Sequence, residues 1–540
     1  VLLNSRACKQ YPIYWLSKSS EGAGEYSFRL PAVAWAPEPN SPFLVGTAAS
    51  EAANQGTGIF LGNFKPYLNL AILYGGRQQP QGEPELAAGQ PPISPHSVQQ
   101  AIAALLAGLN PMNAEAESGL KIGAVGLSQE SLRNALAQLQ GVALSCPAGW
   151  SETYWFNLRE AVLQAGLVKE PDQIFFVEEA IAALLSRLPT DREQATGNPS
   201  LLVIQVGATT TELALVDLPD NPQSLTHADF TLRSFPWGGN ALEQDIFCQL
   251  IYPQWRSKLH PSLANLQEEL PRPGEPDLKR RHDLALGLQS CPLGRALLEA
   301  AQLIEAILQQ QQEFTSSLGN HQWHIKRQDI DVMVIEPLIQ QLDRQVDQLL
   351  SQAGNQATAI AQVTCSGGTV LAMGRSLYGW LTAKFPNATL VQETVEDSPL
   401  RVAAGLARLP LFPNCLDRPR HQYSDYFLLG ELLQTIPDRP FTLEGLMQRL
   451  HRRGINTRFC RDRIVKLLNG ELPPGLVPSS TAAKGLVETS QETLDWKVPL
   501  CSPLENGTYS PNLEQCQRLR QHLEAILSQT RQKLTEPLTI

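Results

Sequence analysis

Residues 201–218 have the sequence LLVIQVGATTTELALVDL, and this stretch decides the predicted fold class. Leu201–Val206 and Glu212–Leu218 are apolar runs whose length and β-branched residues predict two strands. The turn Gly207-Ala208-Thr209-Thr210-Thr211 joins them. Glycine and small polar residues between two apolar runs are typical of a tight connection. We therefore expect a strand–turn–strand unit here.

The residues before this unit alternate between strand and helix patterns. Gly141–Cys146 and Gln173–Val177 are short apolar runs, whereas Ser151–Ala165 and Glu178–Leu188 have helical spacing. Alternating units of this kind favour an α/β fold with a mixed sheet.

The rest of the first 410 residues extends this pattern. The first 85 residues consist of short apolar runs broken by prolines and predict a β-rich region, which an exposed loop at Gln78–Pro95 follows. Residues 241–353 are expected to be mostly helical. Further predictions are helices at Ser97–Leu109, Gly294–Gln312 (with Gln309–Gln312 on its solvated surface), Ile335–Gly354, Leu371–Phe385 and Ser398–Arg408, and a strand at Ala359–Thr364.

Composition excludes several classes of protein. Apolar residues make up 43% of the 540 residues and charged residues 18%, which is far from the composition of a disordered chain. The net charge of −10 argues against a surface built as a whole for nucleic acid or anionic membrane. The sequence contains no stretch of about 18 apolar residues, so we expect no membrane span. The nine dispersed cysteines form no zinc-site spacing, and we expect reduced thiols in the cytoplasm.

Three glycine turns are candidate phosphate sites, because a tight turn with small side chains lets several N–H groups point at one spot. They are Gly207–Thr211, Gly238-Gly239-Asn240 and Gly367-Gly368-Thr369. None matches a Walker A or G-x-G-x-x-G pattern, and each one alone is more often plain turn geometry. Their order along the chain is the more specific signal.

That order resembles the ATPase domain of the DnaK-type heat-shock chaperones, within the actin and hexokinase superfamily. The resemblance covers about 400 residues, although each motif is degenerate. The matching segments are Gly141–Leu167 (GVALSCPAGWSETYWFNLREAVLQAGL), Ile174–Leu188 (IFFVEEAIAALLSRL), Leu201–Leu218, Phe235–Ile246 (FPWGGNALEQDI), Val363–Gly374 (VTCSGGTVLAMG), Thr394–Leu406 (TVEDSPLRVAAGL) and Phe60–Lys65 (FLGNFK).

The resemblance implies two lobes around a deep cleft that holds ATP or ADP with magnesium. Lys65 falls at the family's catalytic lysine, and Glu178 at the acidic residue that helps to hold magnesium through water. The same resemblance assigns the nucleotide contacts to three turns, with Gly207, Thr209 and Thr210 on the second phosphate loop, Gly238 and Gly239 on the loop below, and Gly367 and Gly368 on the adenosine turn. Each residue also has a structural interpretation: Lys65 as a solvated loop residue, Glu178 as a helix N-terminal carboxylate, and the glycines as turn residues.

The sequence departs from the family at charged positions. Gln205 stands where the family has the aspartate of the second phosphate loop, and a neutral amide is a poor partner for magnesium. On the helix that normally contacts adenosine, the alignment places Gln302, Glu305 and Ala306. Val1–Cys8 lacks the aspartate and glycine of the first phosphate loop. Either a preceding segment carries that loop or the loop has decayed, and the other losses favour decay.

The C-terminal region differs from that of the chaperones, since no series of short alternating strands follows Leu409. We expect a chaperone-like domain at 1–410, a proline-rich linker at 411–425 and a small, mainly helical domain at 426–540, with a winged-helix-like arrangement as one option. Predicted elements are helices at Tyr426–Thr435, Thr442–Arg452, Asn456–Leu468 and Asn512–Lys533, and a strand at Glu488–Pro499.

Residues 441–470 resemble a helix–turn–helix, with Gly454 between two helices and Asn456 or Thr457 as a cap. Seven basic residues against Glu444 and Asp462 give this segment a net charge of +5. Arg458 and Arg461 are candidates for contact with nucleic acid. The alternatives are a solvated helical face and a protein-docking module.

Three functions remain open. The first is a DnaK-like protein with weakened or lost ATP hydrolysis that acts as a protein-interaction or assembly factor. The second is a slow ATP-driven chaperone acting on a client protein. The third is a regulator that binds nucleic acid through residues 441–470. Phosphoryl transfer depends on placed charges and metal, so the losses at charged positions favour the first. We expect nucleotide with magnesium to bind weakly or not at all.

Overall fold

The structure is a computed structural model that describes residues 1–4, 9–16, 26–38, 41–55, 58–69, 95–110, 121–188, 199–255, 270–289, 292–308, 311–318, 321–391, 400–473, 476, 498–505 and 507–534. It is mixed α/β with several sheets, as predicted. The chain forms two compact units. Unit 1 comprises Val1–Tyr14, Ser145–Gly149 and Val177–Leu416, and unit 2 comprises Trp15–Leu144, Trp150–Phe176 and Asp417–Ile540.

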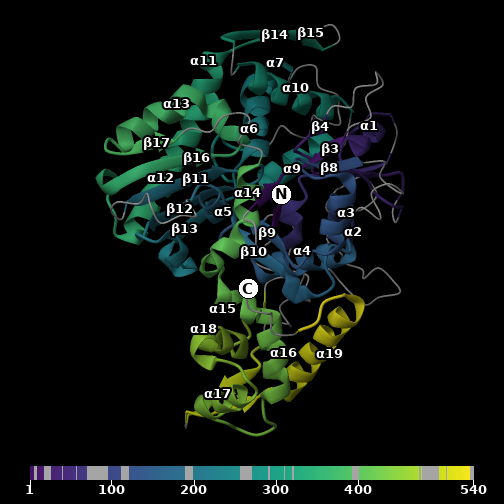
Figure 1. Cartoon of the computed structure of the whole chain (residues 1–540), viewed down its shortest axis with the longest axis vertical. Coiled ribbons are helices and arrows are strands. Elements are labelled where there is room, and N and C mark those ends of the chain that lie inside the picture. Colours follow the sequence, from purple (N-terminus) through teal and green to yellow (C-terminus); the bar gives the residue numbers. More distant parts are fainter. Residues whose placement is uncertain are drawn as a thin grey trace. The chain divides into compact units, whose positions relative to one another are not determined.

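Unit 1 is built on a five-stranded sheet in the order β13-β12-β11-β16-β17 (Figure 1). β11 pairs with β12 in antiparallel and with β16 in parallel orientation, so the sheet is mixed, as expected. These strands are β11 (Ser200–Val206), β12 (Thr211–Asp217), β13 (Thr231–Phe235), β16 (Ile360–Ser366) and β17 (Thr389–Val391).

The central position of β11 explains its sequence. All residues from Leu201 to Val206 are buried, and Leu202, Ile204 and Val206 belong to the main core of the unit. A strand that is covered on both faces needs a nearly continuous apolar run rather than an alternating one. The helices of unit 1 are α5 (Glu179–Leu185), α6 (Gly239–Ile246), α7 (Tyr252–Trp255), α9 (Leu278–Gln289), α10 (Pro292–Leu308), α11 (Arg327–Ile330), α12 (Glu336–Ala353), α13 (Gly368–Lys384) and α14 (Arg401–Ala407).

Two further strand pairs complete unit 1. They are β1 (Leu2–Asn4) with β2 (Lys9–Tyr11), and β14 (Glu313–Leu318) with β15 (His321–Lys326). The second pair corrects the prediction for Gln309–Gln312. Helix α10 ends at Leu308, and Gln311 and Gln312 lead into β14 instead of extending the helix. The structure does not describe Gln309 and Gln310.

The N-terminal part of unit 2 carries two three-stranded sheets, β4-β3-β8 and β6-β5-β7. This agrees with the β-rich region expected there, except that Thr47–Gln55 forms helix α1. The strands are β3 (Ile13–Leu16), β4 (Tyr26–Ser27), β5 (Val33–Ala36), β6 (Leu44–Val45), β7 (Ile59–Gly62) and β8 (Lys121–Ala124). The other helices are α2 (Pro95–Ala107), α3 (Gln129–Ala137) and α4 (Glu152–Gln164). The strands β9 (Val142–Cys146) and β10 (Ile174–Glu178) pair with each other, and the chain passes between the units within them.

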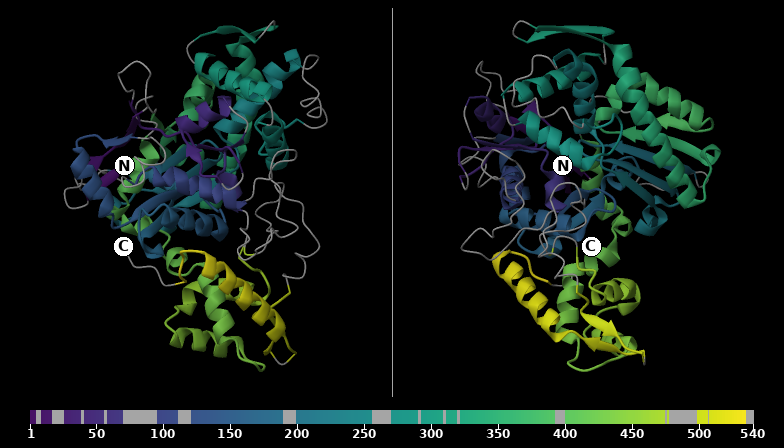
Figure 2. Two further views of the ribbon diagram at one scale, coloured as in Figure 1. Left: turned by 90° about the vertical axis from the view of Figure 1, so that its right-hand side faces the viewer. Right: turned by 180° about the vertical axis from the view of Figure 1, so that it is seen from behind.

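The C-terminal part of unit 2 is mainly helical, as expected, and its helices and hairpin form one group in all views (Figures 1 and 2). Its elements are α15 (Arg418–Gln422), α16 (Asp425–Thr435), α17 (Leu443–Arg452), α18 (Thr457–Leu468), β18 (Cys501–Pro503), β19 (Tyr509–Pro511) and α19 (Leu513–Gln529). Asn456 caps α18 by accepting the N–H of Arg458, and Gly454 has a φ of 92° between α17 and α18. This supports the predicted helix–turn–helix arrangement.

Residues 411–425, expected as a linker, are not an extended exposed loop. They contain a 3₁₀ turn at Pro413–Cys415 and helix α15, and the side chains of Phe412, Cys415 and Tyr423 are buried. The predicted domain borders at 410 and 426 do not coincide with the borders of the two units. The loop expected at Gln78–Pro95 and the strand expected at Glu488–Pro499 lie almost wholly outside the described residues. Among the described helices, none is long and apolar enough to cross a membrane.

Candidate functional site

The first two glycine turns of unit 1 touch each other. The turn between β11 and β12 is closed by a hydrogen bond of 2.8 Å from the Gly207 N–H to the Thr210 carbonyl. The Gly239 N–H then donates to the Gly207 carbonyl, and the Asn240 N–H to the Ala208 carbonyl, both at 2.9 Å. A Cβ on Gly238 would lie only 2.5 Å from the Gly207 carbonyl oxygen, so no larger residue fits without displacing the turn.

The third turn lies against the same place. Gly367 follows β16, the neighbour of β11, and has a φ of 108°. A Cβ there would lie 2.0 Å from the Val206 carbonyl oxygen, which makes glycine necessary for both conformation and space. A Cβ on Gly239 would lie 2.9 Å from the Thr369 hydroxyl. The structure therefore brings Gly207, Gly239 and Gly367 together, with Thr209, Thr210, Gly238 and Gly368 in the same turns.

Two helices begin at this cluster of turns, α6 at Gly239 and α13 at Gly368. The N-terminus of a helix attracts anions through its free N–H groups and its dipole. At α6, however, the N–H groups of Gly239 and Asn240 donate to the carbonyls of Gly207 and Ala208. The first turn of α6 is thus capped by the β11–β12 turn, which leaves fewer donors for a phosphate.

Gln205, which the sequence resemblance aligns with an aspartate of the chaperones, is also engaged within the protein. It lies at the end of β11, is 5% exposed, and its Oε1 accepts a hydrogen bond from the hydroxyl of Ser366 at the end of β16. The amide therefore joins two neighbouring strands, and it carries no charge that a magnesium ion requires.

Three carboxylates lie near the start of α5. Glu178 is 5% exposed and its Oε1 lies 3.1 Å from Nε2 of His227. Glu212 is fully buried, and its Oε2 accepts the N–H of Ala180. Glu179 approaches the first turn, since its Oε2 would lie 3.1 Å from a Cβ on Gly207. Sequence reasoning found Glu178 but missed Glu179, Glu212 and His227; the EE pair at 178–179 was the available signal.

The hydroxyl of Thr210, in the first glycine turn, is buried and has no hydrogen-bond partner among the described residues. The side chain of Thr210 is 1% exposed. In the part of the chain that the structure describes, no group of three or more histidine, cysteine, aspartate or glutamate side chains is arranged to hold a metal ion.

Lys65 belongs to unit 2, whereas the glycine turns and Glu178 belong to unit 1. It begins a 3₁₀ turn at Lys65–Asn69, and its Nζ lies 5.8 Å from the ring centroid of Trp150. Its role as a catalytic lysine stays a prediction.

The residues that the sequence resemblance aligns with adenosine contacts lie on α10, and one of them forms a polar contact with α6. Gln302 on α10 donates to Oε2 of Glu243 on α6 at 2.9 Å. Burial raises the pKa of Glu243 to about 7. Burial, and then the charge of Glu243, raise the pKa of Glu305 to about 8. Near neutral pH a part of these two carboxyl groups is therefore protonated, and the rest carries negative charge. A nucleobase that donates hydrogen bonds to a carboxylate would fit beside them better than a phosphate, which the negative charge repels. Glu243 was missed because it follows the GGN turn without a motif of its own.

Two of the seven basic residues in segment 441–470 form ion pairs with residues of α16. Arg453 is paired with Glu431 at 2.6 Å, and Arg463 with Asp425 at 2.6 Å, so both charges are compensated from α16. The exposed basic residues on α17 and α18 are Arg449, Arg452, Arg458, Arg461 and Lys466. Phe459 on α18 is 68% exposed among them. Sequence reasoning noted the basic residues but not this aromatic side chain.

Comparison of the sequence with protein-family models and with curated proteins found no match for this chain.

Proposed function

We propose that this chain is a DnaK-like chaperone-family protein whose ATP hydrolysis is weakened or lost, and that it acts as a protein-interaction or assembly factor. The observation that carries the proposal is the closed cluster of glycine turns. Gly207, Gly239 and Gly367 lie together, and the N–H groups of Gly207, Gly239 and Asn240 and the side chain of Gln205 form hydrogen bonds within the protein.

The chemistry of phosphoryl transfer explains why this arrangement favours weak catalysis. The reaction needs a metal ion and donors placed at the developing charge. Gln205 supplies no charge and is held by Ser366, and Glu178 is held by His227. These contacts stabilise the strands and turns, and a nucleotide that used Gln205 or Glu178 would have to break them.

Titration calorimetry with Mg-ATP and Mg-ADP tests the proposal. We expect no binding at micromolar protein, or binding with a dissociation constant above about 100 μM, which is a standard free energy of about −5.5 kcal/mol. Gln205→Asp restores the charge of the family's aspartate and is expected to strengthen binding of Mg-ADP. Gln352→Asp on the exposed face of α12 is the matched control and should change nothing. Tight binding of Mg-ADP by the unaltered protein would favour the slow ATP-driven chaperone instead.

A second candidate function is binding of nucleic acid through residues 441–470. The exposed Arg458, Phe459 and Arg461 favour it, because arginine contacts phosphates and an aromatic ring stacks on bases. The order of elements supports it further: α16, an isolated bridge from Phe441 to Tyr509, α17, α18 and the hairpin β18–β19 resemble a winged helix.

Fluorescence anisotropy with a labelled random duplex tests this candidate. If it is correct, affinity falls steeply between about 50 and 200 mM salt, and removing one phosphate contact lowers the salt slope by about 1. Arg458→Ala and Arg461→Ala should each weaken binding, whereas Arg375→Ala in unit 1 should not. Equal binding by all four proteins would exclude α18 as a nucleic-acid interface.

A further inference from the structure

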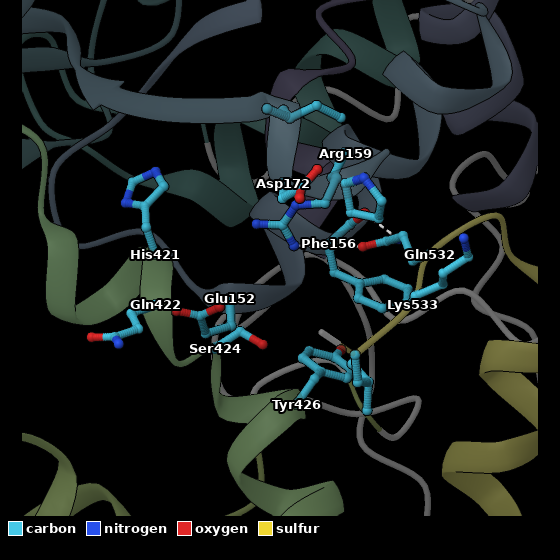
Figure 3. A pocket seen from close by; sticks show the side chains of 13 residues that line it. Glu152, Phe156, Arg159, Asp172, His421, Gln422, Ser424, Tyr426, Gln532 and Lys533 are labelled. Atoms are coloured by element: carbon cyan, nitrogen blue, oxygen red, sulfur yellow. Dashed lines mark hydrogen bonds between the residues drawn. The ribbon is translucent and has the colours of Figure 1, made fainter. Parts of the chain in front are cut away.

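A small cavity in unit 2 is lined by none of the candidate site residues that the sequence predicted (Figure 3). Its volume is about 30 Å³, which is room for roughly two water molecules or one small polar group. Helix α4, the start of β10, the segment around α15 and the residues after α19 supply its walls. The lining residues are Glu152, Phe156, Arg159, Pro171, Asp172, Ile174, His421, Gln422, Ser424, Tyr426, Gln532, Lys533 and Leu534.

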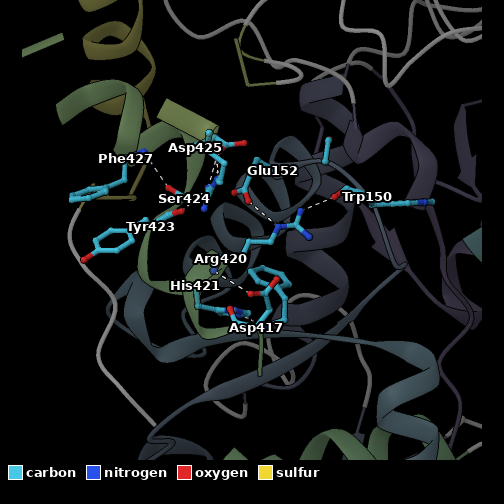
Figure 4. A network of polar contacts seen from close by, with 12 residues as sticks. Trp150, Glu152, Asp417, Arg420, His421, Tyr423, Ser424, Asp425 and Phe427 are labelled. Carbon is cyan, nitrogen blue, oxygen red and sulfur yellow. Dashed lines mark hydrogen bonds and ion pairs between the residues drawn. The ribbon is translucent and has the colours of Figure 1, made fainter. Parts of the chain in front are cut away.

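Most polar groups of the wall are already engaged. Arg420 pairs with Glu152 at 2.9 Å, donates to the Trp150 carbonyl at 2.6 Å and lies over the ring of Trp155 (Figure 4). The charge of Glu152 is therefore compensated. Lys533 pairs with Glu170 at 3.1 Å outside the cavity.

His421 is engaged through both ring nitrogens. Its Nε2 accepts the N–H of Phe176 at 2.9 Å, so the proton is on Nδ1, which donates to the Asp417 carbonyl. The ring is thus held as the neutral form and offers nothing to a ligand.

Arg159 is the exception. Its guanidinium points toward the space that the side chains enclose (Figure 3) and lies 5.3 Å from the ring centroid of Phe176. Its one hydrogen bond to a residue that the structure describes is to Oε1 of Gln532 and has a length of 3.5 Å, at the limit for such a bond. No carboxylate of the described residues lies within 4.0 Å of it. Burial, together with the nearby Arg420, lowers its pKa, while Glu152 opposes this. Arg159 is half-buried, and a guanidinium with five donors and one long hydrogen bond to the described residues keeps donors that a ligand in the cavity can accept from.

Gln532 fixes one side of this site. Its Nε2 donates to the Phe156 carbonyl at 2.9 Å, which orients its Oε1 toward Arg159. Phe156 in turn stacks on Tyr426 with ring centroids 4.6 Å apart. The cavity therefore has an aromatic wall and two cations among its lining residues, of which Lys533 is ion-paired with Glu170 and Arg159 has no carboxylate partner among the described residues.

We propose that this cavity binds one carboxylate group through the guanidinium of Arg159. The planar fork of arginine matches two carboxylate oxygens, and such charge-assisted bonds are the strong ones. The half-buried Asp172 also lines the cavity, so a singly charged group is accommodated better than a doubly charged phosphate. The carboxylate can come from a free small acid or from the chain end of a peptide.

Thermal unfolding of the full chain with sodium acetate tests the proposal, with sodium chloride at equal ionic strength and acetamide as the uncharged analogue. Acetate is expected to raise the unfolding temperature, because a ligand that binds only the folded state stabilises it. Arg159→Gln should weaken acetate binding by about tenfold or more, and Arg159→Lys, which keeps the charge but not the fork, by an intermediate factor. Arg518→Gln on the exposed face of α19 is the matched control.

Asp172→Asn gives a test in the opposite direction. Removing its negative charge should strengthen acetate binding several-fold, so the proposal remains testable even where Arg159→Gln does not fold. A short peptide with a free C-terminus, compared with its C-terminal amide, distinguishes a peptide source from a free acid. The proposal is wrong if acetate and chloride act alike on the unaltered protein, if phosphate binds more tightly than acetate, or if Asp172→Asn has no effect.

Discussion

Gly238→Ala is the substitution that best tests the contact between the first two glycine turns. The φ of Gly238 is −164°, extended backbone that alanine also adopts, so the cost comes from space alone. The new Cβ would lie 2.5 Å from the Gly207 carbonyl oxygen, 2.6 Å from the Ala208 carbonyl carbon and 2.7 Å from the Thr209 nitrogen. An ordinary contact begins at 3.4 Å, so the turn must move by about 0.9 Å.

The expected loss of stability follows from this displacement. Overpacking of this kind costs about 1–3 kcal/mol. The hydrogen bonds from Gly239 and Asn240 to the moving turn contribute about 0.5–1.5 kcal/mol each. We expect the free energy of unfolding of unit 1 to fall by roughly 2–6 kcal/mol.

Hydrogen exchange, read by mass spectrometry on peptides that contain Gly239 and Asn240, measures this locally, and urea denaturation measures it globally. Gly379→Ala on α13 is the control, because a Cβ there meets nothing within 4 Å. It should stabilise the helix by about 0.5–1 kcal/mol. If Gly238→Ala leaves both the exchange rates and the stability within about 0.5 kcal/mol of the unaltered protein, the turns do not touch as described.

Two further predictions concern acidic side chains that are half-buried or buried. The raised pKa values of Glu243 and Glu305 mean that the folded state binds protons more tightly than the unfolded state; stability should therefore fall as the pH rises from about 5 to 8, and Glu305→Gln should flatten that dependence in urea titrations. A free energy of unfolding that rises over this pH range would contradict the prediction. Arg420→Ala leaves the buried Glu152 carboxylate without its ion-pair partner and should cost about 3–5 kcal/mol of stability in denaturant titrations; a loss below about 1 kcal/mol would show that the pair is not buried as described.

The sequence predicted elements well wherever one pattern dominated. The apolar runs at 201–206 and 212–218 became β11 and β12 within one residue at each end. Helix α12 ends at Ala353, and Gly354 follows it with a φ of 67°, which suits the left-handed position after a helix. In contrast, β14–β15 was missed because the glutamines before it continue the helical pattern of α10. Helix α1 was missed because its alanine-rich sequence at 48–53 is short and lies between two apolar runs that predicted strands.

The candidate sites were less predictable because they depend on contacts between distant residues. That Gln205 is neutral is visible in the sequence, but its bond to Ser366 joins positions 161 residues apart. The cavity around Arg159 is assembled from α4, β10, the segment around α15 and the residues after α19, and no local pattern marks it. Phe459 lies on a helix whose basic residues were noted, yet only the structure shows that its ring is exposed.

Single-turnover hydrolysis of radiolabelled ATP with magnesium, at an excess of protein, tests the central claim most directly. The closed turns and the neutral Gln205 predict no phosphate release above that of a protein-free control. Measurable release that Glu178→Gln and Lys65→Ala both abolish would contradict this, since it would require those two side chains to act at one nucleotide.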